Sequence, residues 1–331
     1  MNFKIKAPKL NFEGFIEIKK AYTEGIYADT PINRKLGRVG MGYKEYNEKL
    51  NKSSSSNSIL DKEGSIDYKN LNIISNEIIK GTKRINALNK EEEQGRVKGG
   101  RKNVEASIIC KAIGEFYKND TNFNAKSRGI EERRLILEYA KKTDCYFDKE
   151  KLNKIVKEKL AKGAESQVYI SEDIRYVIKE FHPLFMSESI NESLDNLSLY
   201  NYIFEENNYE VLGFGEDEGG ELTFILKQPL IQGETLSYKV RQADNQREKT
   251  LDYKQQIFND LSKRIGLIQY SGGNEYANSQ YSIADVHLGN VMEVKGFDGL
   301  LYIDVNTSLT TKDDFTFGKR EYGDGLIVNN D

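Results

Sequence analysis

Apolar residues recur at helical spacing in several stretches of the chain. Between positions 104 and 120, Ala106, Ile109, Ile113 and Phe116 follow one another at intervals of three or four. This spacing places them on one side of a helix and predicts a buried face. The same kind of pattern predicts four more helices: 129–143, 148–160, 187–206 and 251–270.

Short strand-like runs replace the helical pattern after position 165. They read "SQVYI", "RYVIKEF", "YEVLGFGED" and "ELTFILKQPL". The last run contains Gln228 and Pro229, and proline cannot donate a hydrogen bond to a sheet, so this strand is expected to end or reach an edge there. Separate runs of helices and strands indicate an α+β fold.

Residues 1–103 lack long periodic apolar runs. The stretch "NKSSSSNS" (51–58) predicts a flexible link, and "EEEQGRVKGGRK" (91–102) predicts a charged, glycine-containing break. Helices are expected to begin near Val104. We therefore predict a basic, partly irregular extension, a helical segment and a compact domain: 1–103, 104–150 and 151–331.

Length and composition indicate a soluble globular protein. A chain of 331 residues with 38% hydrophobic and 31% charged residues is long enough to bury a large core. It has no apolar run of the roughly 18 residues that a membrane helix needs, and its N-terminus has no apolar core of signal-peptide length. We therefore expect a cytoplasmic protein without a membrane partner. Cys110 and Cys145 lack metal-ligand spacing and are expected to be reduced thiols.

The net charge of −3 hides an uneven distribution of charge along the chain. Residues 1–103 carry 21 Lys and Arg against 13 Asp and Glu, whereas residues 104–331 carry 28 against 39. A basic segment of this kind can bind nucleic acid. It can also pack on an acidic domain or form a solvated surface, and the sequence leaves these interpretations open.

The stretch "YSIADVHLGNVM" (281–292) concentrates residues suited to catalysis. It contains Asp285, one of the two histidines of the chain at position 287, and Asn290 five positions after the aspartate. A predicted hairpin follows and leads to a strand that ends at Asp304, nineteen positions after Asp285. Two carboxylates and an amide in this order can orient an acceptor hydroxyl and bind a metal ion.

A second set of candidates lies in the strand-rich region. A tight turn at Gly163, Ala164, Glu165 and Ser166 can lay backbone N–H groups over phosphate oxygens. Lys179 lies sixteen positions after Gly163, on the same strand face as Val177, and can pair with nucleotide phosphates. Two further features complete the set. One is a helix carboxylate beside the lysine, Glu192 or Asp195, a choice that stays open, and the other is a hinge for the base at Gln228 and Leu230.

The order of these elements resembles the signature of the protein-kinase superfamily. That signature contains a phosphate-binding turn, a strand lysine, a helix carboxylate, a hinge, a catalytic aspartate, an asparagine five positions later and a metal-binding aspartate. The present chain departs from it in its single loop glycine and in Val305 and Asn306, which follow Asp304 in place of Phe-Gly. The loop glycine resembles the compact phosphate loops of atypical kinases.

The catalytic loop also departs from the common pattern. Ile283 stands two positions before the aspartate, where the signature has histidine, and His287 follows the aspartate instead. This order resembles loops of aminoglycoside and choline phosphotransferases. We expect His287 to fix the loop by a hydrogen bond. Only 27 residues follow Asp304, so the second lobe is expected to be reduced.

A closer resemblance accommodates these departures. "EERRLILEYAKKTDCYFD", "KGAESQVY", "ILKQPLIQGE", "YANSQYSIADVHLGNVM" and "YIDVNTS" are together similar to the serine/threonine kinase domain of polyvalent proteins, over residues 130–310. The resemblance implies a protein-kinase-like two-lobe fold, with a β-rich first lobe and a reduced, mainly helical second lobe that carries a catalytic hairpin. A helical or irregular N-terminal extension would precede it. It also implies a role in bacterial or phage mobile DNA, in the cytoplasm of a bacterial host cell.

The resemblance implies ATP and Mg²⁺ as cofactors and assigns roles to the candidates. Lys179 would bind phosphates, Asp285 would accept the proton of the attacked hydroxyl, and Asn290 and Asp304 would hold Mg²⁺ through hard oxygen ligands. The acceptor would be an unknown protein, with the chain's own serines at 53–58 as one candidate. Two alternatives stay open: a small-molecule phosphotransferase, and a pseudokinase or DNA-associated protein that acts through residues 1–103.

Overall fold

The described chain forms two compact units in this computed structural model. One contains the described residues of 42–201 and 208–230, and the other those of 202–207 and 231–309. The structure describes these residues: 48, 50–51, 59–85, 93–163, 165–184, 187–265, 269–272, 274–277, 281–295, 297 and 299–309. Ala164 and the serine-rich stretch 53–58 lie outside them.

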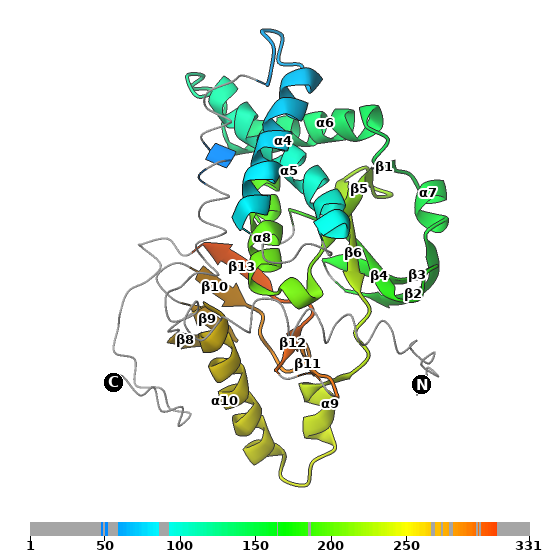
Figure 1. The fold of residues 1–331 in the computed structure, drawn as a ribbon, viewed down its shortest axis with the longest axis vertical. Coiled ribbons are helices and arrows are strands. Elements are labelled where there is room, and N and C mark those ends of the chain that lie inside the picture. The colour runs from blue at the N-terminus through cyan, green and yellow to red at the C-terminus, as the bar shows by residue number, and fades with distance from the viewer. Residues whose placement is uncertain are drawn as a thin grey trace. The chain divides into compact units, whose positions relative to one another are not determined.

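A six-stranded sheet dominates the first unit (Figure 1). Its strand order is β1-β5-β6-β4-β3-β2. The strands are β1 (Tyr146–Phe147), β2 (Val156–Lys162), β3 (Ser166–Ser171), β4 (Tyr176–Phe181), β5 (Glu210–Glu216) and β6 (Leu222–Pro229). All four predicted strand runs are confirmed as β3 to β6, and β6 ends at Pro229 as expected. With the helices, this confirms an α+β fold.

Five helices accompany this sheet in the described part of the chain. They are α4 (Tyr68–Ile85), α5 (Glu93–Phe116), α6 (Ala125–Lys142), α7 (Lys149–Asn153) and α8 (Ile190–Ile203), which the short 3₁₀ helix η1 (Glu205–Asn207) follows. The predicted helices near 104–120, 129–143 and 187–206 are confirmed as α5, α6 and α8 with η1.

The predicted break at 91–102 is wrong, and helices begin well before Val104. Helix α5 starts at Glu93 and runs through this stretch. Its later turns contain isoleucines at positions 108, 109 and 113 with no exposed surface. Arg101 on α5 also donates hydrogen bonds to Asn76 of α4 and to Glu105. Tertiary contacts of this kind outweigh the low helix propensity of glycine.

The prediction of one helix over 148–160 is wrong in its second half. Helix α7 ends at Asn153, and β2 begins at Val156 and pairs with β3. Leu152 of α7 packs in a cluster with Phe147, Ile178 and Ile225. The backbone beyond it is paired in the sheet, and this pairing overrides a local sequence pattern that also suits a helix.

The second unit contains η1, two α-helices and two small sheets among its described residues. The helices are α9 (Leu236–Arg241) and α10 (Gln246–Ile265). One sheet has the order β13-β10-β9-β8 and the other β12-β11-β7. The strands are β7 (Glu234–Thr235), β8 (Gln269–Gly272), β9 (Glu275–Ala277), β10 (Tyr281–Ala284), β11 (Val291–Glu293), β12 (Leu301–Tyr302) and β13 (Asn306–Leu309).

One prediction for this unit is confirmed, and another is wrong in its bounds. The predicted hairpin after the catalytic loop is confirmed, because β11 and β12 pair antiparallel. The predicted helix over 251–270 starts earlier, at Gln246, and ends at Ile265. From Gln269 the chain pairs with β9 as β8, so strand pairing ends the helical pattern. None of the helices in the described residues is both long and apolar enough to cross a membrane.

Strand β4 separates two environments in the first unit. Its residue Ile178 faces the cluster of Phe147, Leu152 and Ile225. Val177 and Lys179 alternate with Ile178 and therefore point to the other face. Helix α8 covers that face, because Tyr200 of α8 accepts a hydrogen bond from Gln228, the cross-strand neighbour of Val177. The lysine thus lies on the face that α8 covers.

Candidate active site

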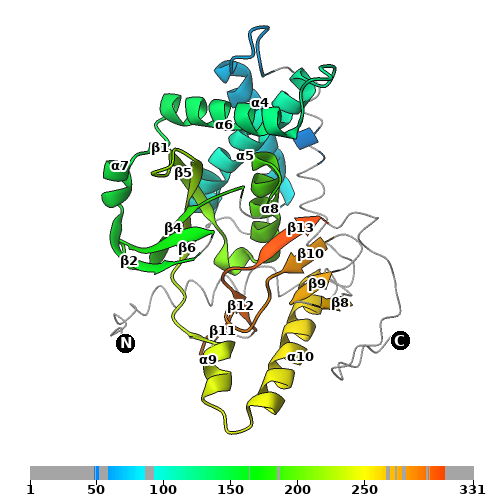
Figure 2. The ribbon, with the colours of Figure 1, turned by 180° about the vertical axis from the view of Figure 1, so that it is seen from behind.

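The loop between β10 and β11 is held at one end of a strand pair. β10 and β13 lie side by side (Figure 2), and Ala284 pairs with Asn306. Asp285 comes directly after Ala284, and Asp304 comes two residues before Asn306. Because the strands are antiparallel, both aspartates emerge at the same end of the pair. The fold therefore brings together two residues that lie nineteen positions apart in the sequence.

The side-chain amide of Asn290 connects these two aspartates. Its Nδ2 donates to Asp285 Oδ2 at 3.0 Å, to the Asp285 carbonyl at 3.1 Å and to the Asp304 carbonyl at 2.9 Å. All three partners are acceptors, so the nitrogen must face them and Oδ1 is the amide atom suited to a metal ligand. The structure thus places three predicted residues in one hydrogen-bonded set.

This set fits Mg²⁺ in the chemistry of its donors. Asn290 Oδ1 and the exposed carboxylate of Asp304 are hard oxygen donors, and Mg²⁺ binds through few protein ligands together with phosphates and water. Among the described residues, no group of three or more His, Cys, Asp and Glu side chains forms a metal-binding cluster. Asn290 Oδ1 and the Asp304 carboxylate are the two donors of this set that could hold such an ion.

The backbone of Asp285 adopts a conformation that is uncommon for a residue other than glycine. Its φ is +59°, in the left-handed region, and such residues concentrate at functional sites. The next residue, Val286, is buried and donates its N–H to the carbonyl of Asn274 at 2.9 Å. Asn274 belongs to the turn between β8 and β9 and also has a positive φ, of +65°. The β8–β9 hairpin therefore supports the strained loop.

His287 stabilises the same loop. Its Nδ1 accepts a hydrogen bond from the Gly289 N–H at 3.0 Å, which confirms the expected role. The proton of the neutral ring is therefore on Nε2, which lies 3.7 Å from Asp285 Oδ1. A Cβ atom at Gly289 would lie 2.8 Å from His287 Cε1. A larger residue at position 289 would therefore require the imidazole of His287 to shift.

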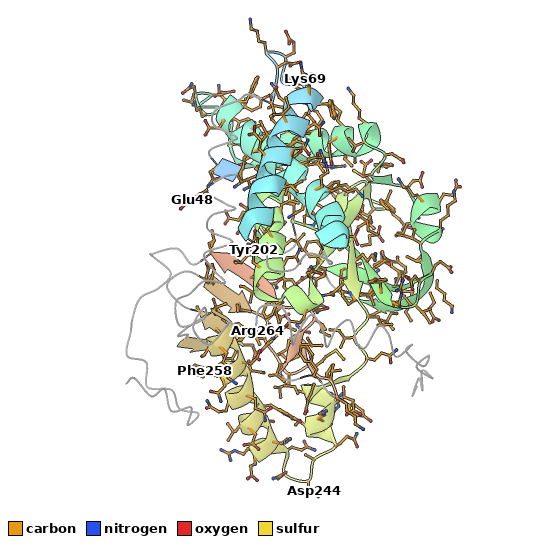
Figure 3. All side chains as sticks on the ribbon, in the orientation of Figure 1. Glu48, Lys69, Tyr202, Asp244, Phe258 and Arg264 are labelled. Atoms are coloured by element: carbon orange, nitrogen blue, oxygen red, sulfur yellow. The ribbon has the colours of Figure 1, made fainter. Side chains whose placement is uncertain are left out.

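A buried ionic network supports the strand that leads to Asp304. Arg264, near the C-terminal end of α10 (Figure 3), pairs with Glu206 at 2.6 Å and with Asp260 at 2.7 Å. It also donates to the carbonyl of Leu300 at 2.9 Å. Tyr302 of β12 donates its hydroxyl to Asp260 at 3.0 Å. Burial raises the pKa of Tyr302 well above its usual value, so this hydroxyl remains a donor.

Lys179 is buried in the first unit, with 5% of its surface exposed. Its neighbours across the sheet are Val168 of β3 and Leu226 of β6. Its Nζ donates a hydrogen bond to the hydroxyl of Tyr209 at 2.9 Å. Tyr209 was not predicted, because it lies 30 positions away and precedes β5, where no periodic pattern marks it.

The two candidate carboxylates make other contacts. Glu192 Oε2 accepts from the Glu188 N–H at 2.8 Å at the N-terminus of α8, as a capping residue does. Asp195 pairs with Lys111 at 3.3 Å. Burial raises the pKa of Asp195, and the charge of Lys111 opposes this shift. The pairing of either carboxylate with Lys179 stays a prediction.

The predicted phosphate turn joins β2 to β3. The Gly163 N–H donates to the Ser166 carbonyl at 2.9 Å, and the Glu165 carbonyl accepts from the His182 N–H at 3.0 Å. These bonds form a tight turn of the predicted kind. Ala164, which follows Gly163 in the sequence, is outside the described residues.

The predicted hinge residues contact α8 and the strand edge. Gln228 is buried, and its Nε2 donates to the Tyr200 hydroxyl at 3.2 Å. The Leu230 N–H donates to the carbonyl of Arg175 at 2.8 Å. Their predicted contact with the base of a nucleotide is not tested by these bonds and stays a prediction.

Comparison with known proteins identifies one family. Residues 129–311 match the family described as serine/threonine/tyrosine kinase found in polyvalent proteins. The match covers more than half of the 331 residues. No curated protein matches the chain. The chain therefore belongs to the serine/threonine/tyrosine kinase family of polyvalent proteins.

Proposed function

We propose that the chain is an atypical protein kinase that transfers the γ-phosphoryl group of ATP to a serine or threonine hydroxyl of a protein, with Mg²⁺. The observation that carries the proposal is the hydrogen bonding of Asn290 to both Asp285 and Asp304. In a chain of a kinase family, these residues have the order and the contacts that phosphoryl transfer needs.

The proposed chemistry assigns Asp285 to the acceptor hydroxyl. Its carboxylate would orient the hydroxyl and accept its proton as the new bond to phosphorus forms. The Asn290 bond at 3.0 Å fixes one carboxylate oxygen. The other, Oδ1, faces His287 Nε2 at 3.7 Å. Fixing the carboxylate in this way lowers the cost of organising it in the transition state.

Asn290 Oδ1 and the Asp304 carboxylate would hold Mg²⁺, which supplies positive charge to the phosphate oxygens when bound. The Asn290 amide nitrogen donates to the Asp304 carbonyl at 2.9 Å. That bond keeps the backbone of the aspartate close to the amide. Both ligands would therefore be preorganised before the nucleotide arrives.

The groups of the sheet unit would bind the nucleotide itself. Lys179 would pair with the α- and β-phosphates, and the turn at Gly163 to Ser166 would cover them. Gln228 and Leu230 would border the base. The position of Lys179 on β4 supports this role, because its Nζ is held 2.9 Å from the Tyr209 hydroxyl.

The family also suggests a setting for the reaction. We extend the proposal to a protein encoded by bacterial or phage mobile DNA that acts in the host cytoplasm. Nucleic-acid binding by residues 1–103 and phosphorylation of the chain's own serines belong to the proposal as further expectations. Each is separable from the kinase activity by experiment.

The decisive experiment measures transfer of labelled γ-phosphate from ATP with Mg²⁺. The native chain is compared with Lys179→Met, Asp285→Asn and Asp304→Asn, with a set of serine, threonine and tyrosine peptides as acceptors. A matched control is Asn259→Ala, which removes an exposed hydrogen bond with Gln255 on α10. We expect label on protein or peptide, lost in the first three variants and kept in the control.

The location of the label separates the alternatives. Label on a small molecule would replace the proposal with a small-molecule phosphotransferase. ATP binding without transfer to any acceptor would indicate a pseudokinase. Absence of ATP binding would overturn the proposal and direct attention to nucleic-acid binding, whose affinity should fall steeply with salt.

A further inference from the structure

The hydrogen-bond partner of Lys179 at Tyr209 is itself firmly held. The two atoms, Lys179 Nζ and Tyr209 Oη, are 2.9 Å apart. Asn201, at the end of α8, accepts from the Tyr209 N–H at 2.7 Å and donates to the Tyr209 carbonyl at 2.8 Å. A side-chain amide that pairs with both backbone groups of one residue fixes its position and orientation. Tyr209 is therefore anchored before it meets the lysine.

A second contact fixes the ring of Tyr209. The ring of Tyr200 packs against it, with centroids 4.7 Å apart and planes inclined by 44°. The Tyr200 hydroxyl accepts from Gln228, which pairs across the sheet with Val177. Val177 lies two positions before Lys179 on the same strand face. A closed chain of contacts therefore runs from the lysine through both tyrosines back to its own strand.

We propose that Tyr209 is a positioning residue for the nucleotide-binding lysine, an inference that rests on the kinase function proposed above. A phenol hydroxyl is a neutral acceptor, so this bond orients the ammonium without cancelling its charge. An ammonium has three N–H donors, and one of them is directed to Tyr209. Held in this direction, the ammonium can act on phosphate oxygens through its positive charge.

Helix α8 takes part in this arrangement through Asn201, near its C-terminal end. Glu192 caps the start of α8, and Asp195 pairs with Lys111. Asn201 acts at the other end of the helix by holding Tyr209. Helix α8 therefore influences the lysine through an amide and a phenol.

The test compares Tyr209→Phe with the native chain in steady-state kinetics with Mg²⁺ and ATP. The ring and its packing remain, and only the hydroxyl is lost. Loss of a hydrogen bond to a charged group predicts a rise in KM for ATP of about tenfold, with kcat changed less. Asn201→Ala should raise the same KM by releasing Tyr209. Far-ultraviolet circular dichroism and the melting temperature monitor the fold in every sample.

A matched control is Tyr146→Phe. It removes a hydroxyl that donates to Glu216 at 3.2 Å in the same sheet, and its KM should equal that of the native chain. A KM for Tyr209→Phe within twofold of the native value, with ATP binding lost in Lys179→Met, would overturn this inference alone. ATP binding kept in Lys179→Met would overturn the proposed function as well. If either Tyr209→Phe or Asn201→Ala unfolds, the KM for ATP of the other variant tests the positioning role of Tyr209.

Discussion

At the scale of single residues, the amide of Asn290 has a task that few side chains can perform. It donates to two carbonyls and one carboxylate from a single nitrogen and presents an oxygen on its other side. Aspartate has the same size but no donor, and alanine has neither atom. The site therefore depends on the chemistry of the amide as well as on its shape.

The substitution Asn290→Asp tests this dependence. It would place a second carboxylate about 3 Å from Asp285 Oδ2 and opposite two carbonyl oxygens, all of which repel it. We expect phosphoryl transfer to fall on the order of 100-fold with little change in the melting temperature. Asn259→Asp, at an exposed position of α10, is the control. Activity of Asn290→Asp above a tenth of the native rate would show that the amide nitrogen is dispensable.

A second residue-scale prediction concerns the buried carboxyl of Glu132. It has no exposed surface, pairs with Arg128 at 2.9 Å and accepts from the Ile190 N–H at 3.0 Å. Burial raises its pKa, although Arg128 and the N–H groups of α8 oppose the shift. The folded state therefore holds this proton more tightly than the unfolded state does.

The sign of the pH dependence follows from that difference. The contribution of Glu132 to stability is complete below the unfolded pKa of about 4.3 and decreases as pH rises through the folded pKa. Urea unfolding of the native chain and of Glu132→Gln, from pH 4 to pH 8, should show the native chain losing stability relative to the variant as pH rises. A difference between the two that is independent of pH would contradict the raised pKa.

At the scale of elements, the parallel pairing of β1 with β5 depends on two glycines. A Cβ atom at Gly213 would overlap the carbonyl of Cys145 and lie 2.9 Å from the ring of Phe147, and one at Gly215 would lie 2.5 Å from the Phe147 carbonyl. The sequence Gly-Phe-Gly thus leaves space for the backbone of β1. Phe214 between them is fully buried.

Gly213→Val should therefore weaken the edge of the sheet. Forcing side-chain atoms into a filled space costs about 1–3 kcal/mol, and the native pairing of Phe147 with Gly215 would be disturbed. The measurement is the free energy of unfolding in urea. Gly129→Ala on α6 is the control, because its Cβ would meet nothing within 4 Å and alanine favours helix. Equal stability of the two variants would contradict the close approach of β1.

The local sequence is sufficient to predict some of the helices and strands and insufficient to predict others. Strands β4 and β6 were predicted because their apolar residues match the period of their own pairing. The sequence pattern of β2 predicts the end of a helix, since Lys, Leu and Ile recur there at a spacing that suits both a helix and a strand. The hydrogen-bonded pairing with β3 makes this stretch a strand. Helix α5 extends through glycines because of its contacts with α4. Such long-range contacts leave no local periodic signal.

In the candidate site too, some contacts are predictable from the sequence and others are not. Asp285 and Asn290 lie in one loop, and their spacing predicts joint action only together with Lys179 upstream and Asp304 downstream. The expected carboxylate partners of Lys179, Glu192 and Asp195, both lie in α8. Tyr209 contacts the lysine only after β4 and the segment before β5 have folded against each other. A hydrogen bond across 30 positions is a property of the fold rather than of any motif.

At the scale of the whole molecule, the region that matches the kinase family is not a complete structural unit. The match begins at residue 129, whereas α4 and α5 belong to the same compact unit as the sheet. Asn103 of α5 donates to Ser198 of α8 at 2.6 Å, and Lys111 pairs with Asp195 of the same helix. Glu105 accepts from the Tyr139 hydroxyl of α6 at 2.6 Å. These contacts connect α5 to α6 and to α8.

The last prediction therefore compares two shortened chains, 42–331 and 117–331, which differ in α4, α5 and the residues before them. Ile108, Ile109 and Ile113 of α5 have no exposed surface, and burial of each contributes about 1.5–3 kcal/mol. Their sum approaches the total stability of a typical domain, about 5–15 kcal/mol. Chain 42–331 should melt cooperatively and protect the amides of β4 and β6 from hydrogen exchange, and chain 117–331 should do neither. If 117–331 protects those amides as well as 42–331 does, the kinase-family region folds without α5, and the contacts at Ser198 and Asp195 are dispensable.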